Sequence, residues 1–91
     1  MNFQFTQNAW EDFEYWMDHD PAITGKIRDL MRSIRQDPFK GLGKPEPLRH
    51  TLQGYWSRRI SGEHRIVYQV SEPKGSSQKC VIIQCRYHYD K

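Results

Sequence analysis

The stretch that most constrains the fold runs from residue 55 to residue 68, where two extended runs flank a short glycine-containing turn. This pattern is typical of an antiparallel β-hairpin. Because successive side chains of a strand point to opposite faces, the number of turn residues decides which residues share a face. An even number would mix polar and apolar side chains on both faces. A turn of Ser61, Gly62 and Glu63 separates them, and we therefore predict this odd register.

In this register one face of the hairpin is largely apolar and contains Trp56, Arg58, Ile60, His64, Ile66 and Tyr68. The other face collects Tyr55, Ser57, Arg59, Arg65, Val67 and Gln69. Arg59 then lies directly across from Arg65, and like charges in that position repel each other. A phosphate would relieve the repulsion, because guanidinium groups match its geometry. The alternative interpretation is that both arginines are exposed and only keep the strand soluble.

The distribution of charge favours a polyanionic partner. Residues 1–25 contain five acidic residues and no lysine or arginine, whereas residues 26–91 hold all fourteen basic residues and six acidic ones. Positive charge gathered in one part of a small domain is typical of nucleic-acid binding. The same distribution is also compatible with a role in solubility alone.

The length of 91 residues predicts one domain, spanning 1–91, with a single modest core. No run is long and apolar enough to cross a membrane, and the first residues do not resemble a signal peptide. Cys80 and Cys85 are five positions apart in one predicted strand, so we expect them on opposite faces and unable to bridge each other. These features favour a reducing cytoplasm.

Two helices are predicted after a short strand over residues 2–6. Asn8 and Glu11 have the spacing of a capping box, which would start the first helix near Ala9. Asp20 is the expected cap of a second helix, which would end before Pro38. The apolar residues expected to face the core are Ala9, Phe13, Trp16 and Met17 in the first helix and Ile23, Ile27, Leu30, Met31 and Ile34 in the second.

Several strands are expected after the helices. Residues 39–47 are too rich in glycine and proline for regular structure, and we expect a loop there. Residues 48–52 are a candidate strand, and residues 79–87 form a final strand after a polar turn. This order predicts an α+β fold with both helices on one face of a mainly antiparallel sheet of four or five strands. The other face is then left to Arg59, Arg65 and His88.

Four segments, in this order along the chain, closely resemble the YoeB-type toxins of the RelE superfamily: residues 43–48 (GKPEPL), 56–60 (WSRRI), 63–68 (EHRIVY) and 86–89 (RYHY). The resemblance extends over nearly the whole chain. It implies the RelE-like fold and an endonuclease that cuts messenger RNA in the A site of the bacterial 70S ribosome, with no metal or cofactor. It also implies a YefM-like antitoxin as inhibitor and a homodimer.

The same resemblance assigns roles to individual residues. Glu46 matches the general base of the family, His88 its general acid, and Arg65 the arginine that stabilises the phosphate. Tyr89 matches the terminal active-site tyrosine. The positions that match basic residues around the family's site, and would bind the substrate, are Lys44, Arg49 and Arg59.

These side-chain types suit RNA cleavage without a metal. A carboxylate takes the proton of a 2′-hydroxyl, which then attacks the neighbouring phosphorus. Guanidinium groups stabilise the charge that develops on the phosphate, and an imidazolium protonates the departing 5′-oxygen. The products would be a cyclic or 3′ phosphate and a 5′-hydroxyl. None of the histidines and cysteines has the spacing of a metal site.

Two features depart from the family pattern. The turn over residues 71–78 is longer than usual, and Asp90 and Lys91 extend past Tyr89, where family chains often end. Two other classes of function remain open. The chain could be a superfamily relative that binds and blocks a target such as gyrase without cutting RNA. It could also be a non-catalytic RNA-binding module that uses Tyr55, Trp56 and the arginines.

Overall fold

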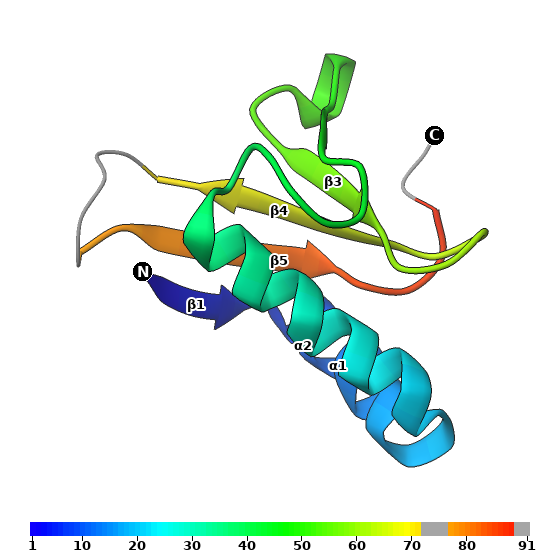
Figure 1. Cartoon of the computed structure of the whole chain (residues 1–91). Helices are drawn as coiled ribbons and strands as arrows, with labels where there is room; N and C mark the ends of the chain where they lie inside the picture. The colour runs from blue at the N-terminus through cyan, green and yellow to red at the C-terminus, as the bar shows by residue number, and fades with distance from the viewer. Residues whose placement is uncertain (72–76, 89–91) are drawn as a thin grey trace.

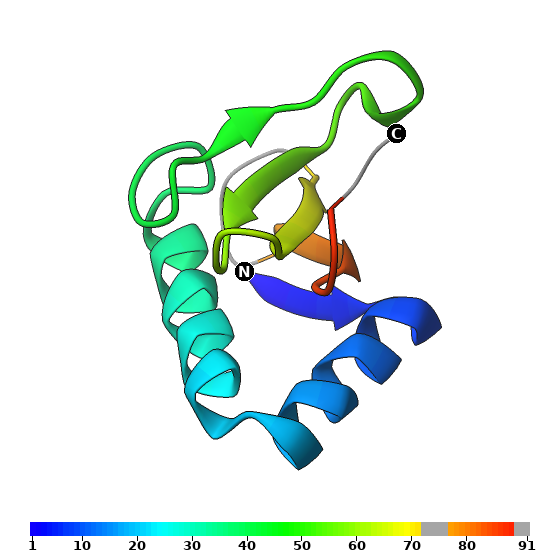
Figure 2. The ribbon, with the colours of Figure 1, turned by 90° about the vertical axis from the view of Figure 1, so that its right-hand side faces the viewer.

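In a computed structural model, which describes residues 1–71 and 77–88, two helices pack on one side of a five-stranded sheet (Figures 1 and 2). The elements are β1 (Asn2–Phe5), α1 (Gln7–His19), α2 (Pro21–Gln36), β2 (Glu46–Pro47), the 3₁₀ helix η1 (His50–Leu52), β3 (Trp56–Arg59), β4 (Arg65–Val70) and β5 (Lys79–Gln84). The strand order is β1-β5-β4-β3-β2, with β1 parallel to β5 and the other neighbours antiparallel. The predicted α+β fold is confirmed.

The hairpin of β3 and β4 has the predicted odd register. Arg58 pairs with Ile66, and Arg59 pairs with Arg65. The N–H of Ile60 donates to the carbonyl oxygen of His64 at 2.9 Å, which closes the turn. Alternation of apolar and polar residues was therefore sufficient to define the pairing.

The hydrophobic core lies between the helices and the sheet. Its fully buried members from α2 and the strands are Ile27, Leu30, Ile34, Ile66, Tyr68, Cys80 and Ile82. The predicted stripe of α2 is confirmed, and Ala9 and Trp16 of α1 are buried as expected. Met17 is 43% exposed, contrary to the prediction, because it lies one position further around the helix than Trp16. Among the described residues, neither helix is long and apolar enough to cross a membrane.

The first helix begins earlier than the predicted start near Ala9. Thr6, not Asn8, is its N-cap, and the Thr6 hydroxyl accepts a hydrogen bond from the Ala9 N–H at 3.2 Å. Asn8 already lies in the first turn, where its side-chain amide donates to the carbonyl oxygen of Ile83 at 3.2 Å. The capping-box interpretation was wrong because a neighbouring strand competes for the Asn8 side chain.

The Thr6→Ala variant is expected to lower the free energy of unfolding by about 1 kcal/mol, because an N–H of the first turn loses its partner. The matched Asn8→Ala variant is expected to change it by less than about 0.5 kcal/mol, since its hydrogen bond is exposed to water. Chemical denaturation measures both values. If Asn8→Ala lowers the free energy of unfolding more than Thr6→Ala does, the assignment of Thr6 as the N-cap is wrong.

Residues 48–52 do not form the predicted strand. Only Glu46 and Pro47, which fall in the predicted loop, pair with β3 as β2. His50 has a φ of 58°, a left-handed conformation that ends any extended run and turns the chain into η1.

The last strand ends at Gln84 and not at Tyr87 as predicted. Both backbone groups of Cys85 bond to α1: its N–H donates to Asp12 Oδ2 at 3.0 Å, and its oxygen accepts from Trp16 Nε1 at 2.9 Å. The hydrogen-bonded pairing of β5 with β4 therefore stops at Gln84. The predicted alternation of side chains between the two faces of the sheet does not extend to Cys85. Cys80 and Cys85 lie in the same core cluster, not on opposite faces, and both are free thiols.

Burial governs the ionisation of the two cysteines and of Asp12. It raises the pKa of Cys80 and Cys85 to about 12, so neither is a thiolate near neutral pH. Burial also raises the pKa of Asp12, although the hydrogen bond from the Cys85 N–H stabilises the carboxylate and partly offsets this effect. The cysteines are therefore packing residues and not nucleophiles.

Candidate functional site

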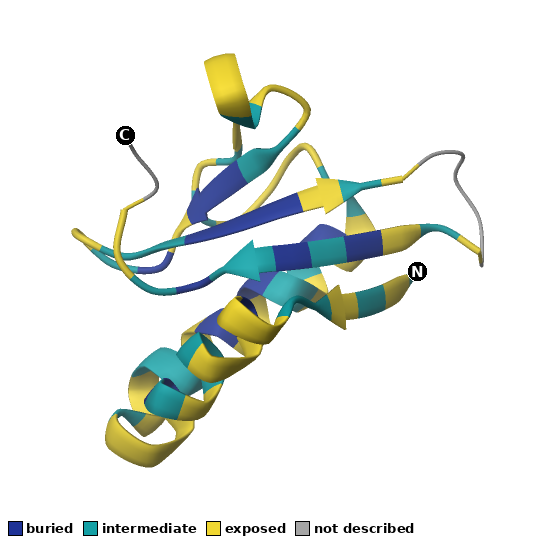
Figure 3. Cartoon of the chain, turned by 180° about the vertical axis from the view of Figure 1, so that it is seen from behind, coloured by how far each residue is buried: buried dark blue, intermediate teal, exposed yellow. Residues whose placement is uncertain are grey.

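A row of four paired residues crosses the sheet. Glu46 pairs with Ser57, Ser57 with Val67, and Val67 with Gln84. Paired residues point to the same face, which here is the face opposite the helices. Ser57 and Val67 are 2% and 0% exposed, so the centre of this row is shielded from water (Figure 3). Strands are about 4.8 Å apart, which places Glu46 and the β4 residue Val67 about 10 Å from each other.

The loop before Glu46 has a tightly defined backbone. Gly43 and Lys44 have positive φ values of 83° and 53°. A Cβ atom on Gly43 would lie 2.7 Å from the Leu30 side chain, so only glycine fits this approach to α2. The Gly43 oxygen accepts a hydrogen bond from the Arg59 N–H at 2.7 Å. The loop is thus attached to β3, and the exposed Glu46 follows directly.

The guanidinium group of Arg58 holds the preceding part of this loop from inside the protein. Arg58 is 0% exposed. Its five N–H groups donate to Tyr68 Oη (2.9 Å), Ser33 Oγ (2.7 Å) and the carbonyl oxygens of Asp37 (2.7 Å), Lys40 (3.0 Å) and Leu42 (3.0 Å). The buried Tyr68 hydroxyl, whose pKa is raised by burial, donates in turn to the Pro38 oxygen at 2.7 Å.

Arg58 is a structurally important residue that the sequence pattern did not predict. Its only signal was a charged residue on the apolar face of the hairpin. The five acceptors explain how a charge is accommodated there, because a buried guanidinium needs a partner for every donor.

The paired arginines of the hairpin have different surroundings. Arg59 is exposed. Arg65 is half-buried, and its Nη1 donates to the turn carbonyls of Ser61 (2.8 Å), His64 (3.0 Å) and Gly62 (3.4 Å). These oxygens offset part of the positive charge of Arg65. Its other guanidinium nitrogens make no hydrogen bond to the described residues, so they remain able to bind an anion.

The tail that follows β5 returns beside the start of β4 (Figure 2). The N–H of Arg65 donates to the Tyr87 oxygen at 3.1 Å. The N–H of Tyr87 donates to His64 Nδ1 at 2.7 Å, and Gln84 Nε2 donates to the His88 oxygen at 2.8 Å. The exposed residue His88 is therefore attached through its backbone to the end of the sheet that carries Arg65.

Most of the predicted site residues are neighbours in this arrangement. Glu46 lies beside Ser57, which is two residues from Arg59, or roughly 7 Å along β3. Arg59 pairs with Arg65, and Arg65 holds the tail that carries His88. The remaining predicted residues are placed as follows: Lys44 on the attached loop, Arg49 exposed just before η1, and Tyr89 outside the described residues.

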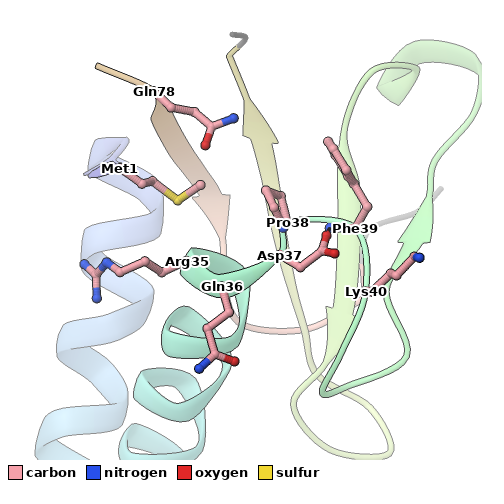
Figure 4. A pocket seen from close by; sticks show the side chains of 8 residues that line it. All are labelled: Met1, Arg35, Gln36, Asp37, Pro38, Phe39, Lys40 and Gln78. Atoms are coloured by element: carbon pink, nitrogen blue, oxygen red, sulfur yellow. Dashed lines mark hydrogen bonds between the residues drawn. The ribbon is translucent and has the colours of Figure 1, made fainter. Parts of the chain in front are cut away.

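A pocket of about 480 Å³ lies elsewhere, at the end of α2 (Figure 4). It is lined by Met1, Arg35, Gln36, Asp37, Pro38, Phe39, Lys40 and Gln78. None of these is a predicted site residue. Within residues 1–71 and 77–88, no group of three or more histidine, cysteine, aspartate or glutamate side chains is arranged to hold a metal ion.

Comparison with known proteins points to one family. Residues 5–89 match the model of the YoeB-like toxin of bacterial type II toxin–antitoxin systems. The chain is 48% identical to Toxin YoeB of Streptomyces coelicolor, covering 98% of this chain and 100% of that protein.

Solved structures agree with the sequence match. A YoeB/ParE toxin from Agrobacterium tumefaciens has a TM-score of 0.91 at 50% identity, over 98% of this chain and 100% of that chain. YoeB from Staphylococcus aureus, solved as a dimer, has a TM-score of 0.86 at 40% identity. In the YoeB-YefM complex from the same species the values are 0.85 and 39%. Each of these two matches covers 98% of both chains.

Proposed function

Because the chain belongs to the YoeB-like toxins of bacterial type II toxin–antitoxin systems, we propose that it is a ribosome-dependent endoribonuclease. It would cut messenger RNA in the A site of the bacterial 70S ribosome and so inhibit translation. The observation that carries this proposal is the neighbour relation of Glu46, the Arg59–Arg65 pair and the tail of His88 on the face without helices.

In the proposed reaction the nucleophile comes from the RNA itself. Glu46 accepts the proton of the 2′-hydroxyl, whose oxygen forms a bond to the adjacent phosphorus. The bond from phosphorus to the 5′-oxygen breaks, and His88 gives a proton to that oxygen. Arg65 and Arg59 stabilise the additional negative charge on the phosphate oxygens. The products are a 2′,3′-cyclic phosphate and a 5′-hydroxyl.

The remaining predicted residues would bind RNA around the reacting phosphate. Lys44 and Arg49, on either side of β2, would contact phosphates of the message or of ribosomal RNA. Tyr89 would complete the site from the end of the tail. This chemistry uses only protein side chains, so we propose no metal and no cofactor.

We further propose a YefM-like antitoxin as the inhibitory partner, a homodimer, and a cytoplasmic location. Support comes from the S. aureus relatives, which were solved as a YoeB dimer and as a YoeB-YefM complex. The excess of basic over acidic residues in the chain suits a partner with acidic segments.

Ribosomes programmed with a defined message test the proposal. We expect cleavage within the A-site codon, mapped by primer extension, and a 5′-hydroxyl on the downstream fragment. A message with a 2′-deoxynucleotide at the scissile position should stay intact, because it lacks the nucleophile. If translation stops while the unmodified message stays intact, the result would instead favour a protein that blocks its target without cutting RNA. Binding without cleavage or arrest would favour an RNA-binding module.

A further inference from the structure

Tyr87 has a backbone conformation that residues other than glycine rarely adopt. Its φ is 67°, and it immediately precedes His88. Such a conformation is unfavourable for a tyrosine, and it persists only where surrounding contacts stabilise it. Tyr87 is 58% exposed, so burial of its ring contributes little to holding it. Among the described residues, the ring contacts the His64 ring, with centroids 5.8 Å apart, and the Arg86 guanidinium group, whose carbon lies 4.7 Å from the Tyr87 ring centroid. Hydrogen bonds to the backbone therefore do much of the holding.

Two side chains supply these polar contacts. His64 Nδ1 accepts the N–H of Tyr87 at 2.7 Å. Gln84 Nε2 donates to the carbonyl oxygens of Arg86 at 3.1 Å, Tyr87 at 3.3 Å and His88 at 2.8 Å. Together they bond to the backbone on both sides of the Tyr87 Cα atom. We refer to the side chains of His64 and Gln84 as the tail latch.

The latch residues are themselves fixed by the fold. The ring of His64 packs edge-on against Trp16 of α1, with centroids 4.8 Å apart, and its side chain is only 13% exposed. Gln84 pairs with the buried Val67 in the row that ends at Glu46. The latch therefore fixes the backbone of the exposed tail relative to the core and the sheet.

Upstream of the latch the tail is anchored differently. The guanidinium carbon of Arg86 lies 3.4 Å from the ring centroid of Tyr15, which attaches this residue to α1. That contact fixes where the tail begins but not the direction that the backbone takes after Tyr87. The Arg65 N–H holds the Tyr87 oxygen at 3.1 Å, and the two side chains of the latch add the contacts to the Tyr87 N–H and to the His88 oxygen.

We propose that His64 and Gln84 are positioning residues that orient His88 for proton donation. This inference rests on the proposed function. Neither residue needs to touch the RNA: each acts through the backbone that carries the acid. Loss of a latch contact should misplace the imidazole by a fraction of a residue length, and misplacement of about 1 Å costs up to about a hundredfold in rate.

A matched pair of variants at His64 tests the acceptor. In His64→Asn the side-chain oxygen reaches the position of Nδ1 and preserves the acceptor, whereas His64→Gln places its amide near Nε2 and removes it. Both variants lose the ring that packs on Trp16. We expect His64→Gln to lower the kcat for message cleavage on ribosomes by about tenfold to a hundredfold, with KM changed less than about twofold. His64→Asn should retain most of the wild-type kcat.

A second pair tests the donor without altering the core. Gln84→Glu keeps the shape of the side chain but replaces the donor with a carboxylate that repels the three carbonyl oxygens of Arg86, Tyr87 and His88. We expect the same loss in kcat. Gln4→Glu, on the exposed outer strand β1, introduces the same charge and should leave kcat and KM unchanged. Equal rates for His64→Gln and His64→Asn, or losses confined to KM, would overturn the inference.

Combination with His88→Ala shows whether the latch acts through His88. If it does, adding His64→Gln or Gln84→Glu to His88→Ala has no further effect on the single-turnover rate. Additive losses would refute a positioning role. If the wild-type protein does not cleave, or His88→Ala cleaves normally, the proposed function fails. If His88→Ala cleaves much more slowly than the wild type while both latch variants match the wild type, only the present inference fails.

Discussion

Replacing Arg58 with methionine is expected to lower the free energy of unfolding by about 3–5 kcal/mol. Methionine retains much of the side-chain length but donates no hydrogen bond. The variant leaves two hydroxyl groups and three loop carbonyls without the donor that they have in the protein. Each buried polar atom that loses its partner costs about 1–3 kcal/mol. Relaxation of the loop and entry of water limit the total.

The neighbouring Arg59→Met variant is the matched control for this measurement. Arg59 is exposed, so we expect its removal to change the free energy of unfolding by less than about 0.5 kcal/mol. Arg58→Lys should fall between the two, because an ammonium group has only three donors and they share one atom. Guanidinium chloride titrations measure all three. Similar values for Arg58→Met and Arg59→Met would mean that the buried network contributes no net stability.

Loss of Arg58 should also affect the site before the protein unfolds. Three of its five acceptors are carbonyl oxygens of residues 37–42, which lead directly to Gly43 and Glu46. We expect Arg58→Met to cleave poorly at temperatures where circular dichroism still reports a folded protein. The buried arginine thus connects core stability with the placement of the proposed base.

The parts of the fold that local pattern controls were predictable from the sequence. The register of β3 and β4 followed from alternation over a short turn, and it placed Arg59 across from Arg65. The apolar stripe of α2 followed from its helical period, with Asp20 as cap. In both cases the residues that decide the structure are close to one another in the chain, so their order alone contains the information.

The parts that were not predictable depend on residues far apart in the chain. The end of β5 is set by Asp12 and Trp16, which are 73 and 69 positions from Cys85. The environment of Arg58 is set by a loop and by Ser33 of α2. The same holds for the tail, whose attachment through His64 has no local signal. The family resemblance suggested Glu46 and His88 as a pair, but only the tertiary contacts describe how each is held.

Replacing the proposed base or acid is expected to have the largest effect on activity. Glu46→Gln keeps the size of the side chain but cannot accept the proton of the 2′-hydroxyl, so we expect the single-turnover rate to fall about 10²–10⁴-fold. His88→Gln removes the proton donor and should lower the rate by a similar factor. Glu14→Gln, an exposed carboxylate on α1, is the control and should cleave normally. Wild-type rates in either site variant would exclude that residue from proton transfer.

A modified message distinguishes the two roles. If sulfur replaces the 5′-oxygen at the scissile bond, the leaving group is a thiolate, which departs without a proton because thiols are much stronger acids than alcohols. The His88→Gln variant should then regain most of the wild-type rate on this message. The Glu46→Gln variant should remain slow, because the 2′-hydroxyl must still lose its proton before it attacks. Equal rescue of both variants, or of neither, would contradict the assignment of Glu46 as base and His88 as acid.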